Sequence, residues 1–207
     1  MSIRLSRGIA LLGACALWAA CSKSDTKVDS AAVADSTAKA NAAAAPAPAP
    51  PPAPAPLTDA NIVAILDGAN ATDSAAGSVA ATKGTHADVK TFGKDMMRDH
   101  HALRKAGEDL AKKLNLTPAM PAGDTSGAVA QTWQGTLNST AKGADWDKAY
   151  IDHEVAYHQA VLSTAQAALG AAQDSSLKAL ITKAAPNIEA HLKHAQAIQT
   201  KLNAAKP

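Results

Sequence analysis

The sequence predicts an all-α protein whose folded part is an up-down-up-down four-helix bundle. Hydrophobic residues make up 47% of the 207 positions, yet only one Phe, two Tyr and three Trp are present. A core built from Ala, Leu, Ile and Val lets helices approach closely and favours helix over strand. Four long stretches repeat apolar residues at helical spacing. Most links between them are short, which is typical of helix bundles.

Residues 1–20 have the pattern of a secretory signal peptide. Arg4 and Arg7 precede an apolar run that is too short to span a membrane. The five residues ending at Cys21 read LWAAC and are similar to a bacterial lipobox, so we expect lipidation of Cys21 after cleavage. Two alternatives remain open: Cys15 as the lipidated residue, and an ordinary secretory signal without a lipid.

These features predict a cell-envelope protein that faces the periplasm and contacts the membrane through its N-terminal lipid. Ser22 after the cysteine favours the outer membrane, and secretion into the periplasm is the alternative. Removal of Arg4 and Arg7 leaves 18 basic and 18 acidic residues. This balance, without a basic stripe, excludes a nucleic-acid partner. The sequence does not identify a protein partner.

Residues 21–56 are expected to form a linker. Seven of the eleven prolines lie between Pro46 and Pro56, in a stretch that is nearly all Ala and Pro. Such a composition cannot form a core and adopts extended polyproline II. The bundle domain is therefore expected over residues 57–207.

The first two helices of the domain are separated by a break at Gly84. Thr58 or Asp59 can cap the first helix. The second is expected from near His86 to about Asn115. A short extra helix over about residues 126–137 follows, and we expect it to place its three apolar side chains over one end of the core. These side chains are Val129, Trp133 and Leu137.

The third long helix is expected from near Asp145 to about Gly170, and the fourth begins near Asp174. Pro186 lies inside the fourth helix and should kink it.

One polar residue interrupts the apolar face of each long helix, about 13–17 residues after the helix begins. Mid-helix positions of antiparallel helices with similar lengths share a layer. The spacing therefore predicts one carboxylate and three imidazoles that converge inside the core. These residues are Asp73, His100, His158 and His191.

Three imidazoles and a carboxylate suit a divalent transition metal such as Fe, Mn, Zn or Cu. Glu154, one turn before His158, is expected to supplement the site or to orient that imidazole. Asp99 lies about 100° around its helix from His100, so we expect it to cap or to form a salt bridge. The chain lacks Glu-x-x-His at the needed positions, which favours one metal over a di-iron site.

Three other interpretations of this layer remain open. The histidines and Asp73 can form a self-satisfied polar layer that only fixes helix register. A small organic ligand is the second, although Ala-rich faces leave little room for haem. Clustered histidines could also sense pH. The histidines outside the apolar faces are expected to be solvated; they are His86, His101, His153 and His194. No nucleophile set or phosphate loop is present.

The domain resembles the bacterial envelope family called domain of unknown function 4142, which belongs with the ferritin-like bundles. The resemblance rests on VKTF at 89–92, MMRDH at 96–100, WDKAYI at 146–151 with His158, and HL at 191–192 with Ala195. It implies a ferritin-like four-helix fold and an envelope location, and it supplies no established reaction. Asp73 stands where the family often has Glu.

These observations lead to two function hypotheses. The first is an envelope-anchored protein that binds a transition metal in its core, for metal handling or protection from oxidative stress. The second is a non-enzymatic envelope binding or structural module with a purely structural His/Asp layer. The sequence leaves open whether the chain is an enzyme.

Overall fold

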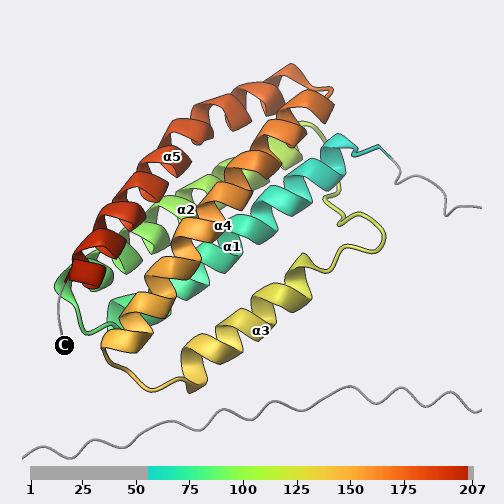
Figure 1. The fold of residues 1–207 in the computed structure, drawn as a ribbon. Helices are drawn as coiled ribbons and strands as arrows, with labels where there is room; N and C mark the ends of the chain where they lie inside the picture. The colour runs from blue at the N-terminus through green and yellow to red at the C-terminus, as the bar shows by residue number, and fades with distance from the viewer. Residues whose placement is uncertain (1–55, 205–207) are drawn as a thin grey trace, which may run out of the picture. The chain divides into compact units, whose positions relative to one another are not determined.

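The computed structural model describes residues 56–204, which form five α-helices and no strand (Figure 1). The expected signal peptide, the lipidation of Cys21 and the linker up to residue 55 lie outside the described residues. No described helix is long and apolar enough to cross a membrane.

The helices begin and end within a few residues of their expected positions. They are α1 (Asp59–Lys83), α2 (Ala87–Lys113), α3 (Ser126–Ser139), α4 (Ala144–Ala171) and α5 (Ser175–Ala204). Thr58 caps α1 in a capping box with Asn61. The carboxylate of Asp174 accepts hydrogen bonds from the first backbone N–H groups of α5. Pro186 lies within α5, which continues past it.

The four long helices pack side by side as two hairpins, α1 with α2 and α4 with α5. Further contacts join α2 to α5 and α1 to α4, which closes the ring (Figure 1). Strict up-down-up-down alternation is wrong, because α4 runs parallel to α2. The first turn of α4 lies beside the α1–α2 turn, where Asp147 meets Thr85. At the other end, Asp59 at the start of α1 accepts a hydrogen bond from Gln173.

Helix α3 is the reason for this direction. It runs back along the outside of α1, so α4 starts at the same end as α2 (Figure 1). Leu137 is buried against the core, and Lys83 donates to the carbonyl groups of Leu137 and Asn138. Trp133 is half-buried. The expectation for Val129 is wrong: it is 64% exposed, since only the C-terminal half of α3 reaches the core.

Helices α1 and α2 approach each other most closely at two glycines. A Cβ atom on Gly77 would lie 2.6 Å from the carbonyl oxygen of Gly93, and one on Gly93 would lie 2.6 Å from that of Gly77. No larger residue fits either position without moving a helix. This close contact lies one turn from Asp73 and brings that residue near the second helix.

The apolar core is divided into two clusters, one at each end of the bundle. The cluster near the α1–α2 turn includes Phe92, Trp146 and Tyr150. The cluster near the α4–α5 turn includes Ile62 and Leu177. In every long helix, the expected metal-site residue lies between the segments that contribute to the two clusters. The middle of the bundle is therefore polar.

Candidate metal centre

All five residues proposed as metal ligands lie in one layer across the middle of the bundle. These residues, here called the polar layer, are Asp73 from α1, His100 from α2, Glu154 and His158 from α4, and His191 from α5. None is more than 7% exposed. One ligand atom from each histidine lies within 4.8 Å of the others, and the same is true of Asp73, Glu154 and His158. The two groups share His158.

The ring of His100 is oriented by Asn70 on α1. His100 Nδ1 donates to Asn70 Oδ1 at 2.7 Å. The amide of Asn70 is itself fixed, because its Nδ2 donates to the carbonyl oxygen of Leu66 at 2.7 Å. The proton of His100 is therefore on Nδ1, and Nε2 carries a lone pair.

The other two imidazoles are held in the same manner by different acceptors. His158 Nδ1 donates to the backbone carbonyl oxygen of Glu154 at 2.9 Å. His191 Nε2 donates to Asp99 Oδ2 at 3.1 Å. A carbonyl or carboxylate oxygen can only accept, so the second nitrogen of each ring carries the lone pair.

The remaining ring nitrogens have no hydrogen-bond partner. These atoms are His100 Nε2, His158 Nε2 and His191 Nδ1, and all three are buried. The three ring centroids lie 5.2–5.7 Å apart. The polar layer thus presents three buried lone pairs from three different helices.

Two carboxyl groups complete the polar layer. Asp73 Oδ2 lies 3.5 Å from His100 Nε2, and Glu154 Oε2 lies 3.5 Å from His158 Nδ1. Asp73 Oδ2, both Glu154 oxygens and the hydroxyl of Tyr150 lack a hydrogen-bond partner. A buried polar atom without a partner costs about 1–3 kcal/mol. These oxygens therefore either pair with one another through a protonated carboxyl group or gain their partner from a bound cation.

Burial opposes every charge in the polar layer. It lowers the pKa of His100 to about 3 and that of His158 to about 4, and it also lowers the pKa of His191. Burial raises the pKa of Asp73 and of Glu154 well above their usual range. In the absence of a cation, neutral imidazoles and protonated carboxyl groups are favoured.

Three contributors to the site differ from the sequence interpretation. Asp99 forms the expected salt bridge with Arg98, but it also orients His191. Asn70 was not singled out, although it precedes Asp73 by three residues and so shares its helix face. Tyr150 was not singled out as a site residue either; its hydroxyl lies near Glu154, which follows one turn later on α4.

The expectation that His153 is solvated is wrong. Its ring stacks on Trp133 of α3, with centroids 3.9 Å apart, and on Tyr157, with centroids 5.5 Å apart. These aromatic rings line a groove of about 660 Å³ between α3, α1 and α4. Of the other three histidines, His86 is half-buried and caps α2, whereas His101 and His194 are exposed.

Imidazole nitrogens with carboxylate oxygens form a donor set for first-row divalent metals. A histidine ligand in a protein typically donates its other N–H to a carboxylate or a carbonyl group, which fixes its tautomer. Every imidazole of the polar layer has such a bond. His100, His158 and His191 are thus the residues that could hold a metal ion, with Asp73 and Glu154 as the oxygen donors.

Comparisons with curated proteins and with solved structures found no match. The family model described as Domain of unknown function (DUF4142) matches residues 27–198, so the chain belongs to this family.

Proposed function

We propose that the chain is an envelope protein that binds one divalent transition metal ion in the middle of a ferritin-like bundle, for metal handling or protection from oxidative stress. One observation carries the metal site. Three buried imidazoles each use one nitrogen to donate to an oxygen and leave the other nitrogen unpaired, and two buried carboxyl groups lie beside His100 and His158.

A cation resolves the electrostatic problem of the polar layer. Two carboxyl groups lie in a core where they resist ionisation, and a divalent ion among them favours their charged forms. The metal then supplies the partners that the unpaired nitrogens and oxygens lack. Iron, manganese, zinc and copper all suit this mixture of ligands.

The arrangement of the helices supports the ferritin-like part of the proposal. Ferritin-like bundles have one long crossover connection, and they build metal sites from side chains on facing helices. Here residues 114–143, which include α3, form one such crossover between parallel helices α2 and α4. The envelope location rests on the N-terminal sequence, with Cys21 as the proposed lipid anchor and the membrane as the partner.

Elemental analysis of the chain, purified without a histidine tag, tests the metal site. After incubation with iron, manganese, zinc or copper and removal of the excess, we expect close to one metal ion per chain. The double variant His100→Ala/His158→Ala should lose this metal. The matched control His101→Ala/His194→Ala removes two exposed histidines outside the polar layer and should retain it. Equal metal content in all three proteins would refute the core site.

A structural polar layer is the second candidate function. One observation favours it: burial favours the neutral form of all five groups, so the layer needs no ion to avoid buried charge. If the wild type takes up none of the four metals, the layer sets helix register. Replacing its members with leucine should then maintain or raise stability.

A further inference from the structure

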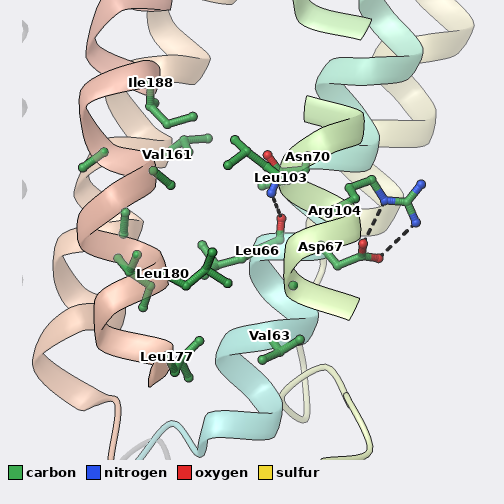
Figure 2. A pocket seen from close by; sticks show the side chains of 16 residues that line it. Val63, Leu66, Asp67, Asn70, Leu103, Arg104, Val161, Leu177, Leu180 and Ile188 are labelled. Carbon is green, nitrogen blue, oxygen red and sulfur yellow. Dashed lines mark hydrogen bonds and ion pairs between the residues drawn. The ribbon is translucent and has the colours of Figure 1, made fainter. Parts of the chain in front are cut away.

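A small pocket lies directly beside the polar layer. It opens between the four long helices, on the side of the layer that faces the α4–α5 turn (Figure 2). Asn70, whose Oδ1 accepts the hydrogen bond from His100, forms part of its wall. The pocket is therefore bordered by Asn70, the residue that orients the proposed metal ligand His100.

The wall of the pocket is almost entirely apolar. Leu66, Leu103, Val161 and Ile188 extend into it from α1, α2, α4 and α5 (Figure 2). Only three polar side chains line it, and each already has a partner: Arg104 bonds to Asp67 at 2.8 Å, and the amide of Asn70 bonds to Leu66 and to His100. The pocket thus offers an occupant little beyond apolar contact.

The volume of the pocket limits what can occupy it. Its room is about 60 Å³, whereas pockets for organic ligands usually measure about 300–1,000 Å³. Water needs two to four polar partners to remain in such a site, and apolar cavities instead stay dry and bind apolar molecules such as xenon. The pocket therefore suits an uncharged molecule of very few atoms.

We propose that this pocket binds an apolar diatomic molecule of the dioxygen class and holds it beside the polar layer. The binding itself depends only on the pocket, whereas its use by the protein rests on the metal site proposed above. Asn70 lines the pocket and accepts the hydrogen bond from His100, so an occupant lies one residue away from a proposed ligand of the metal.

Small residues create the space, and Gly107 is the most informative of them. Gly107 lines the pocket one turn after Leu103, and a Cβ atom there would meet nothing within 4 Å. Residues four apart share a helix face, so a larger side chain at 107 should follow Leu103 toward the pocket. Gly107→Leu is thus expected to fill the space without a clash.

The test uses the metal-free full-length chain with labelled methyl groups. Dissolved dioxygen is paramagnetic, so methyl signals near its binding site relax faster as the gas pressure rises. We expect the methyl groups of Leu177, Ile181 and Ile188, which line the pocket and are buried, to relax at least several-fold more than those of Ile151 and Ile198, which are buried in the other cluster. Xenon should shift the same methyl signals.

Two glycine variants decide the outcome. Gly107→Leu should reduce the effect at the pocket to the level of Ile151. Gly170→Leu is the matched control: that position also has open space but does not line the pocket, so the effect should persist. Uniform relaxation across the core, or an unchanged effect in Gly107→Leu, would overturn the proposal. Because no metal is present, this result is independent of the elemental analysis, so either proposal can fail alone.

Discussion

The three imidazoles of the polar layer owe their orientation to three different acceptors. Asn70 and the Glu154 carbonyl group are buried or half-buried parts of the bundle, but Asp99 is 29% exposed and is also bound by Arg98. Asp99 is therefore the acceptor most open to substitution without damage to the core. It allows the orientation of one imidazole to be tested separately from the ligands.

Asp99→Ala should lower metal affinity about 10–100-fold, the usual effect of losing the acceptor behind a histidine ligand. His191 would then be free to turn, and its unpaired Nδ1 would no longer be held toward the polar layer. Competition with a chromogenic chelator measures the change. Asp99→Asn retains an acceptor oxygen and should recover part of the affinity.

Asp95→Ala provides the matched control for this variant. Asp95 also bonds to Arg98, at 2.8 Å, but has no hydrogen bond to the polar layer. Its affinity should stay close to that of the wild type. A loss of equal size in Asp95→Ala and Asp99→Ala would show that Arg98, and not the orientation of His191, accounts for the effect.

Helical spacing was sufficient to predict which side chains form the polar layer but not which groups orient its histidines. Asp73, His100, His158 and His191 interrupt apolar faces near the middle of their helices, so they share a layer whichever way each helix runs. Asp99 lies about 100° away from His100 on the same helix. Whether Asp99 contacts α5 depends on how α2 is rotated about its own axis. The spacing of residues within α2 does not give this rotation.

At the scale of elements, the α1–α2 contact sets the width of the site. Gly77→Ala would place a Cβ atom 2.6 Å from a backbone oxygen of α2 and 2.8 Å from the Met96 Cβ. Since neither atom is the end of a flexible chain, the helices must separate, and we expect a loss of about 1–3 kcal/mol in the free energy of unfolding. Metal affinity should also fall, because Asp73 moves away from His100.

Gly68→Ala on the same helix is the matched control. Its added Cβ would meet nothing within 4 Å, so better helix propensity should leave stability unchanged or raise it by up to about 1 kcal/mol. Urea unfolding measures both variants. If Gly77→Ala were as stable as Gly68→Ala, the close contact of α1 and α2 would not control the packing of the bundle.

The attachment of α3 to α4 is expected to be sensitive to pH through His153. Burial lowers the pKa of His153 to about 4, whereas an unfolded histidine has a pKa near 6.5. Between these values the unfolded chain binds more protons, so stability is lost as the pH falls. His153→Phe retains a ring between Trp133 and Tyr157 but cannot be protonated.

Denaturant unfolding of both proteins with a chelator present, at several pH values from 7 to 4.5, measures this effect. All other titrating groups are the same, so the difference between the two curves isolates His153. We expect the wild type to lose more stability than His153→Phe over this range. Parallel curves would show that the imidazole is charged at little cost in the folded protein.

The direction of α4 relative to α2 is the feature of the helix arrangement that the sequence did not predict. Residues 116–144 contain two prolines and several glycines, and the sequence predicts one short helix within them. Helix α3 is 14 residues long, about 21 Å at 1.5 Å per residue, which is enough to carry the chain far back along the bundle. A link of this length allows α4 to run either parallel or antiparallel to α2. The hydrogen bond between Thr85 and Asp147, which fixes the parallel direction, joins two segments that are far apart in the sequence, so neither segment predicts it.

Considered as a whole molecule, the bundle has two apolar clusters joined through a polar middle. All four long helices contribute a side chain to that middle. The ion proposed above would link α2, α4 and α5 through the three histidines, and Asp73 would add α1. Unfolding would then require loss of the ion. A site of this kind links metal affinity directly to the stability of the bundle.

Metal should therefore raise the free energy of unfolding of the wild-type chain. At a free metal concentration 100 times the dissociation constant, binding to the folded state alone adds about 2.7 kcal/mol. The urea midpoint should rise while the slope stays constant, and excess chelator should reverse the shift. The urea midpoint of His100→Ala/His158→Ala should not rise at the same metal concentration. That of His101→Ala/His194→Ala should rise as much as in the wild type. A rise in all three proteins would show that the metal binds outside the polar layer, because one of the three lacks His100 and His158. No rise in any of them would leave the polar layer with a structural role, in which helix register, and not ion binding, explains three histidines in an apolar core.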